Sequence, residues 1–276
     1  MTVGFEPLPD DLAEALSAAG ASLGPFARLR YVEEIDSTND SALALALAGE
    51  PEGTAVLADA QRAGRGRRGR SWHSPPGSGL YLSVVVHPPL GGEMVSLVTL
   101  AAGVAVARAV RTTTALPVDL KWPNDIVIGW PWRKLGGLLS EAATNGSRLV
   151  AVVIGIGINR SHASYPRELV GRATDIESEL GRPVDRAPLV VALLGEMRAI
   201  MARLRAGDHE AIGREWRVLG AAGLSRRPVR WRDGDVERRG RAVDIAADGA
   251  LLVETGPGTL ERVVAGEVIW EALTRE

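Results

Sequence analysis

The chain has 276 residues, 46% of them hydrophobic, with 32 basic and 34 acidic side chains and no cysteine. This size allows a substantial core in one large domain or two unequal ones. The near-neutral charge argues against a dedicated nucleic-acid binder, and the lack of cysteine excludes disulfides, thiolate metal sites and a cysteine nucleophile. The acidic N-terminus is unlike a secretion signal, and no uncharged apolar run approaches a membrane span, so we expect a cytoplasmic protein with no membrane partner.

The first elements in chain order are a short helix, a second helix and a strand. Residues 1–30 predict one helix at 9–19, too little for a helix-turn-helix domain, so no DNA partner is expected. A second helix is predicted after the run STND at 37–40. Helix capping alone would explain these polar side chains, and contact with a ligand is the alternative. A strand at 53–60 then leads into an unusual segment.

That segment is residues 61–72, QRAGRGRRGRSW, with five arginines, three glycines and no acid. Arginine stays charged at physiological pH, and glycine lets backbone N–H groups approach a ligand closely. The combination predicts a loop that closes over an anion such as phosphate. Residues 64–69 match the dinucleotide pattern G-x-G-x-x-G, but the SWHSPPGSG that follows cannot begin the required helix. A solvated basic loop remains the alternative.

The rest of the chain predicts a mixture of strands and helices, followed by a change in composition after about residue 224. The predicted strands are 79–87, 118–122, 125–130, 135–141 and 149–158, and the predicted helices are 93–112, 187–206 and 208–219. Five short strands then follow, at 229–232, 238–245, 250–254, 259–264 and 268–271. Because an open sheet that small would leave exposed edges, they predict a small closed barrel. We expect three parts: 1–30, 31–224 and 225–276.

Two further segments carry candidate site residues. The run 121–125, KWPND, has a proline that stiffens the turn and so fixes the lysine, asparagine and aspartate around it. Lys134 begins a strand whose next residues include two glycines, which leaves room beside the backbone. The run 155–159, GIGIN, indicates close approach either by a ligand or by a packed helix, and the two are equally compatible with the pattern. There is no P-loop, no nucleophile elbow and no metal-ligand spacing of histidines.

Taken in order, STN at 37–39, the arginine-rich run at 61–72, KWPND at 121–125, KLGG at 134–137 and GIGIN at 155–159 resemble the biotin–protein ligase family. The resemblance is to members without a DNA-binding domain. It implies an α+β fold, with a mixed sheet flanked by helices like that of class II aminoacyl-tRNA synthetases, and an SH3-like C-terminal barrel. The implied reaction forms biotinyl-5′-AMP from biotin and ATP and then transfers biotin to a lysine of a biotin carboxyl carrier domain of an acyl-CoA or pyruvate carboxylase. A lipoate–protein ligase-like acyltransferase is the alternative.

The resemblance also implies roles for individual residues. The catalytic group would be Lys134, Arg67, Asp125 and Lys121. Biotin would contact Ser37, Thr38, Asn39, Gln61, Arg65, Gly66, Arg67, Lys134 and Gly136. ATP and the adenylate would contact Arg65, Arg67, Arg68, Trp72, Lys121, Asn124 and Asn159, with an adenine loop within 160–174. Mg²⁺ would arrive on the ATP phosphates, no protein metal site is assigned, and a monomer or weak dimer is expected. The run at 61–72 would act as a flap that orders over biotin and shields the reactive anhydride.

Overall fold

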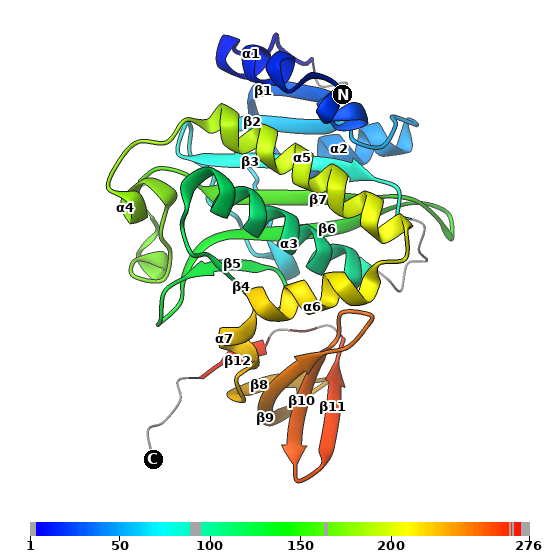
Figure 1. Cartoon of the computed structure of the whole chain (residues 1–276), viewed down its shortest axis with the longest axis vertical. Coiled ribbons are helices and arrows are strands. Elements are labelled where there is room, and N and C mark those ends of the chain that lie inside the picture. Colours follow the sequence, from blue (N-terminus) through cyan, green and yellow to red (C-terminus); the bar gives the residue numbers. More distant parts are fainter. Residues whose placement is uncertain (1–3, 89–94, 163–164, 265, 267, 272–276) are drawn as a thin grey trace.

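The computed structural model describes residues 4–88, 95–162, 165–264, 266 and 268–271. Seven strands form one mixed sheet in the order β1-β2-β3-β7-β6-β5-β4, in which β1 and β2 are parallel and the other neighbours antiparallel (Figure 1). The strands are β1 (Leu29–Ile35), β2 (Ala55–Gln61), β3 (Gly79–Val86), β4 (Asp119–Lys121), β5 (Asp125–Ile128), β6 (Arg133–Asn145) and β7 (Arg148–Asn159). The predicted mixed sheet is confirmed.

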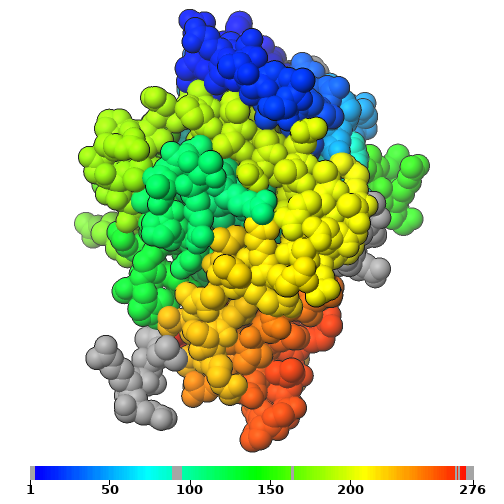
Figure 2. Space-filling view, viewed as in Figure 1, coloured from blue at the N-terminus to red at the C-terminus, as the bar shows by residue number. Residues whose placement is uncertain are grey.

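One face of this sheet is covered by long helices. Helices α3 (Val95–Thr114), α5 (Arg186–Arg205) and α6 (His209–Leu219) lie across it in Figure 1, and they hide the sheet in the space-filling view from the same side (Figure 2). Leu82 and Ile156, which pair across β3 and β7, belong to the main core together with these helices. This face is therefore sealed by apolar packing.

Among the helices of the described ranges, the short helix α2 (Thr38–Leu47) packs on the opposite face, and the central strands beside it border a cavity. Helix α2 packs through its alanines against Val56, Val85 and Val153. These valines alternate along their strands with side chains that face the main core, as strand geometry requires. Since α2 has only 10 residues, part of the central strands is left uncovered on this side. That uncovered area is where a ligand can reach the sheet.

The N-terminal segment is part of the main core rather than a separate unit. Helix α1 (Asp10–Ala19) buries Leu12 and Leu16 in the same apolar cluster as α5, and two short 3₁₀ turns follow at Gly20–Ser22 and Gly24–Ala27. Strand β1, which the sequence did not predict, begins at Leu29, so the expected boundary between residues 30 and 31 falls inside a strand.

The C-terminal region is a separate antiparallel sheet. Its order is β11-β10-β9-β8-β12, and its strands are β8 (Arg227–Asp233), β9 (Val236–Ile245), β10 (Leu251–Gly256), β11 (Thr259–Val263) and β12 (Val268–Trp270). The five predicted strands are confirmed, and the arrangement fits an SH3-like domain. The pairing order found for the described residues ends at β11 and β12 without joining them, so the barrel is not closed by a ladder there.

The other helices differ from the sequence-based expectation in small ways. The helix predicted at 93–112 is α3, and residues 93 and 94 lie outside the described ranges. Two short helices, α4 (Ile176–Leu180) and α7 (Ala221–Leu224), were not predicted. By length and composition α3 could cross a membrane, which qualifies the expectation that no run is long enough, but 67% of its apolar window is buried inside the protein. That degree of burial is typical of a core helix.

Candidate active site

A cavity of about 630 Å³ lies on the α2 side of the sheet. Its wall is formed by the start of α2, the arginine-rich segment, the strands β3, β5, β6 and β7, and the chain around β12. Every residue predicted for the site lines this cavity except Gly136. The five sequence segments that were considered separately therefore meet at one place.

Gly136 is a correction to the predicted biotin contacts. A Cβ atom at Gly136 would lie 2.8 Å from the carbonyl oxygen of Gly157, whereas one at Gly137 would lie 3.2 Å from Nζ of Lys134 and 3.4 Å from the ring of Trp72. Neighbouring residues of a strand point to opposite faces. Gly137, not Gly136, is thus the glycine that keeps the cavity open.

The arginine-rich segment forms a small hairpin, residues 64–72, which we call the arginine hairpin. Gly64 and Trp72 are joined by a backbone hydrogen bond of 2.8 Å, and Gly66 and Arg70 by one of 2.7 Å. A Cβ at Gly64 would lie only 2.5 Å from the carbonyl oxygen of Trp72, so glycine is required there. The next regular element is a strand, β3, which agrees with the rejection of a dinucleotide-binding loop.

The start of α2 forms one end of the cavity. Ser37 caps the helix, as its hydroxyl oxygen accepts from the N–H of Asp40 at 3.4 Å. The backbone N–H and the hydroxyl of Thr38 both donate to Oε1 of Gln61, at 2.9 and 3.1 Å, and Nε2 of Gln61 donates to Ser74 at 3.0 Å. The capping interpretation is confirmed for Ser37, and the run also lines the cavity, while contact with a ligand stays a prediction.

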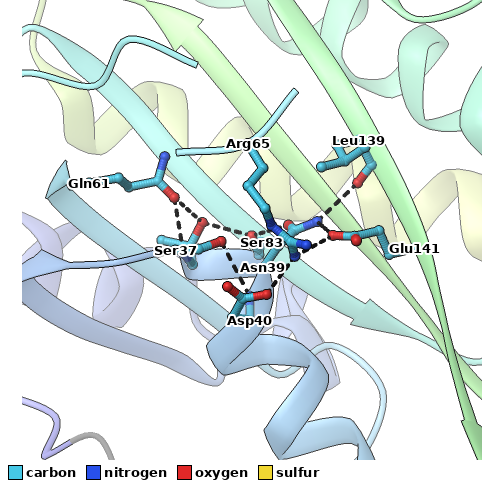
Figure 3. Close-up of polar contacts among 9 residues, drawn as sticks. Ser37, Asn39, Asp40, Gln61, Arg65, Ser83, Leu139 and Glu141 are labelled. Atoms are coloured by element: carbon cyan, nitrogen blue, oxygen red, sulfur yellow. Dashed lines mark hydrogen bonds and ion pairs between the residues drawn. The ribbon is translucent and has the colours of Figure 1, made fainter. Parts of the chain in front are cut away.

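Asn39 was expected to contact biotin, but in this structure its amide makes hydrogen bonds to other residues of the protein (Figure 3). Its Nδ2 donates to Oε2 of Glu141 at 2.7 Å and to the carbonyl of Leu139 at 3.3 Å, while its Oδ1 accepts from Ser83 at 2.6 Å. A Cβ at Gly155 would lie 2.3 Å from Oδ1 of Asn39. The glycine at 155 therefore makes room for a helix residue, and Asn39 positions its neighbours.

Arg65 also differs from its expected role against the ATP phosphates. Its Nη2 lies 2.5 Å from Oδ1 of Asp40 and 2.8 Å from Oε2 of Glu141 (Figure 3). The sequence stretch from 61 to 72 contains no acid, so these partners come from α2 and β6. An arginine held between two carboxylates is already neutralised, which does not favour it as a phosphate ligand.

Three of the four catalytic candidates, Lys134, Lys121 and Asp125, meet at the carboxylate of Asp125. Nζ of Lys134 lies 2.6 Å from Oδ1 of Asp125 and 5.2 Å from the centre of the Trp72 ring, and Nζ of Lys121 lies 4.0 Å from Oδ2 of Asp125. These are the only two lysines among the 32 basic residues of the chain. A compact ammonium group is therefore used only in this cavity, while arginine serves at every other basic position.

The other end of the cavity joins the arginine hairpin to the C-terminal sheet. Nη1 of Arg67 donates to Oδ1 of Asn124 at 3.2 Å, and its Nη2 donates to the carbonyl of Gly266 at 3.5 Å. Nδ2 of Asn124 donates to the carbonyl of Leu138 at 2.6 Å. Asn124 was expected to contact ATP, and in this structure its amide links the arginine hairpin to β6. Arg68, with φ of 58°, lines the same region.

The segment expected to hold adenine does line the cavity. Lys134 pairs with Ala173 in an isolated parallel bridge, which attaches the segment to the start of β6. Nδ2 of Asn159 donates to the carbonyl of Thr174 at 2.9 Å, so this amide fixes the segment rather than pointing at a nucleotide. Within the described parts of 160–174, the lining residues are Tyr165, Glu168, Leu169, Arg172 and Ala173.

Sequence reasoning missed an aromatic cluster and one acid. Trp132 and Trp270 line the cavity, with ring centres 5.5 Å apart, and Trp130 packs against Trp132 at 5.1 Å. Arg227 stacks over Trp130 at 3.5 Å, and burial lowers the pKa of its guanidinium. These contacts join β8 and β12 to the turn before β6, so no local pattern could have revealed them. Glu141, the acid, looked like an ordinary strand residue in the sequence.

The indole Nε1 of Trp72 is a further feature of the cavity. It is buried and has no hydrogen-bond partner in the structure. A Cβ at Gly157 would lie 2.7 Å from this nitrogen, which explains the second glycine of the 155–159 run. In the described part of the chain no group of three or more His, Asp or Glu side chains could hold a metal ion.

The fold and the cavity define the class of protein. Residues 31–159 match the biotin/lipoate A/B protein ligase family, and this match runs from within β1 to the end of β7. Residues 227–270 match the C-terminal domain of biotin protein ligases.

Individual relatives narrow this class. The chain is 32% identical to the biotin–[acetyl-CoA-carboxylase] ligase of Mycobacterium tuberculosis over 94% of this chain and 93% of that one. It is 33% identical to a bifunctional ligase/repressor of Bacillus subtilis, over 87% of this chain and 73% of the other. It is also similar to a biotin protein ligase from Aquifex aeolicus in complex with biotin and ATP, with a TM-score of 0.74, 26% identity, and coverage of 88% and 98%. The chain belongs to the biotin protein ligase family.

Proposed function

We infer that this chain is an ATP-dependent biotin–protein ligase. The observation that carries this inference is the meeting of its only two lysines at Asp125, in a cavity that faces the arginine hairpin. Joining a carboxylate to a polyphosphate requires two anions to approach each other, and fixed cations remove that repulsion. Membership of the biotin protein ligase family indicates that the carboxylate is biotin and that the polyphosphate is ATP.

The first half-reaction forms a mixed anhydride. A carboxylate oxygen of biotin attacks the α-phosphorus of ATP, the new O–P bond replaces the bond to the β-phosphate bridge, and pyrophosphate leaves with its electron pair. Lys134 faces both the carboxylate and the α-phosphate oxygens, and Arg67 and Lys121 face the phosphate chain. Mg²⁺, carried by ATP, would supply charge neutralisation for the departing pyrophosphate. Ser37, with a hydroxyl proton that capping leaves available, donates to the ureido carbonyl of biotin.

The second half-reaction transfers biotin to an amine. The neutral amine of an acceptor lysine attacks the acyl carbon, an N–C bond forms, and the bond to the phosphate oxygen breaks to release AMP. The proton from the nitrogen must go to a base. Asp125 is the carboxylate next to both lysines, and it orients the incoming amine or accepts that proton. The acceptor is a biotin carboxyl carrier domain of an acyl-CoA or pyruvate carboxylase.

The lipoate alternative shares the first of the two family matches but not the second. The biotin/lipoate match covers residues 31–159, which does not separate the two acids. The match at 227–270 is to the C-terminal domain of biotin protein ligases, and the arginine hairpin also favours biotin. We therefore retain biotin as the acid.

The test is transfer to a carrier domain followed by intact mass. The purified chain is incubated with MgATP, biotin and an apo biotin carboxyl carrier domain, with lipoic acid replacing biotin in a parallel reaction. We expect one biotinyl group per carrier with biotin, and none when the carrier's acceptor lysine is replaced by arginine. If the carrier were modified in the lipoic acid reaction and not in the biotin reaction, the lipoate alternative would be supported. If the carrier were modified in neither reaction, the transfer step would be refuted.

A further inference from the structure

Glu141 occupies a position that the reaction scheme does not use. It lies on β6, seven residues beyond Lys134, and its side chain is about one quarter exposed. Its Oε2 accepts two hydrogen bonds, from Nη2 of Arg65 at 2.8 Å and from Nδ2 of Asn39 at 2.7 Å (Figure 3). One carboxylate oxygen therefore joins three separate elements of the cavity wall: β6, the arginine hairpin and α2.

We propose that Glu141, assisted by Asp40, is a positioning residue that clasps Arg65 and so holds the arginine hairpin over the α2 end of the cavity. Arg65 is the hairpin residue whose side chain crosses to this end, while Arg67 reaches Asn124 and Gly266 at the other end. Under the proposed function the α2 end receives the ureido ring of biotin, so the proposal rests on that function for its ligand. The clasp itself is a feature of the chain without any ligand.

Charge and burial together make Glu141 the main partner of Arg65. The arginine hairpin carries several positive charges and no acid of its own. Its guanidinium groups repel one another, so the hairpin needs carboxylates from other elements to stay packed against the rest of the protein. A charge-assisted hydrogen bond is about twice as strong as a neutral one. The carboxylate of Glu141 is 26% exposed and that of Asp40 is 58% exposed, so solvent screens the Asp40 pair more. Glu141 should therefore carry most of the effect.

Glu141 also affects the opposite wall through Asn39. The side chain of Asn39 is buried; its Nδ2 donates to Glu141, and its Oδ1 accepts from Ser83 on β3. If Glu141 acted only by ordering Asn39, the arginine hairpin would not respond to its removal. The two routes are separable, because one passes through Arg65 and the other does not.

The experiment compares Glu141→Gln, which keeps the shape and removes the charge, with Glu34→Gln as a matched control. Glu34 pairs with Arg62 of the same arginine-rich run at 3.4 Å, but both side chains are more than half exposed. The ligand-free full chain is treated with trypsin, and cleavage after Arg67, Arg68 and Arg70 is followed by mass spectrometry. We expect Glu141→Gln to raise the cleavage rate roughly tenfold, the factor for losing one charge-assisted hydrogen bond, with an unchanged melting temperature. Asp40→Asn should raise it less, and Glu34→Gln should match the wild type.

A double mutant identifies the route. In an Arg65→Gln background, Glu141→Gln should add no further cleavage, because the clasp is already absent. In biotin-dependent ATP–pyrophosphate exchange, Glu141→Gln should raise the KM for biotin by a similar roughly tenfold factor and leave kcat within about twofold. The proposal is refuted by unchanged cleavage in Glu141→Gln, or by an equal effect in the Arg65→Gln background. Absence of exchange in the wild type would refute the ligase assignment instead, because the cleavage assay needs no biotin.

Discussion

Replacing Lys134 by alanine should abolish most adenylate formation while leaving the fold intact. The ammonium of Lys134 is 2.6 Å from Asp125, and the side chain is 37% exposed. An ion pair this exposed contributes only about 0–1 kcal/mol to the free energy of unfolding. A fixed donor that faces charge developing in a transition state contributes about 2.7–4 kcal/mol, a factor of roughly 100 to 1,000 in kcat. The rate of the first half-reaction should therefore fall far more than the melting temperature.

The assay is single-turnover formation of biotinyl-AMP, with thermal unfolding measured on the same samples. Arg148→Ala, at an exposed position at the start of β7, is the control and should form the adenylate at the wild-type rate. Lys134→Arg keeps the charge but replaces a compact ammonium by a planar guanidinium, and we expect at least about a tenfold loss. If Lys134→Ala formed biotinyl-AMP within a few fold of the wild-type rate, the role given to this lysine would be wrong.

Three other outcomes follow from the structure. Arg67→Gly removes the hydrogen bonds from the arginine hairpin to Asn124 and Gly266, so we expect biotinyl-AMP to escape and to label added bystander proteins. Because the chain has only two lysines, its own intact mass should show little added label. Burial, and then the hydrogen bond to Asp59, raises the pKa of Tyr31 from 10.0 to about 12. The neutral phenol of Tyr31 therefore stabilises the fold fully below pH 10, and this contribution is lost as the pH rises towards 12. Ultraviolet difference absorption should detect no ionisation of Tyr31 near pH 10 in the folded protein. Leu12→Ala, at a fully buried position of α1, should cost about 2–5 kcal/mol in denaturant unfolding, whereas Leu47→Ala, with 55% exposure, should change the stability by less than about 0.5 kcal/mol. Equal effects of the two leucine substitutions would show that α1 is not part of the core.

Local patterns in the sequence predicted most of the fold. Helices α5 and α6 and strands β3 and β7 follow directly from apolar periodicity and from glycine and proline at their ends. Strand β1 was missed because its residues, LRYVEEI, mix charged and apolar side chains without a clear alternation. It is held by parallel pairing to β2, which is a long-range interaction. The N-terminal helix likewise gave no sign that it would pack into the main core.

The segments that line the cavity were predictable where the residue type itself indicates a chemistry. Lys134, Asp125 and the arginine hairpin came from short segments whose composition has few structural explanations. The partners of those residues were not predictable: Arg65 was assigned to phosphate because Asp40 and Glu141 lie on other elements. Polar side chains that serve the protein, such as Asn39 and Asn159, look the same in a sequence as those that serve a ligand. Only the hydrogen bonds separate the two.

The measurement that tests the central claim most directly is ATP–pyrophosphate exchange with the purified chain. Labelled pyrophosphate is incubated with MgATP and either biotin, lipoic acid or no acid. We predict rapid incorporation of label into ATP with biotin only, because under the proposed function the first half-reaction is reversible and needs biotin and ATP together. Exchange that depends on lipoic acid, or no exchange with either acid, would contradict the assignment of this chain as a biotin–protein ligase.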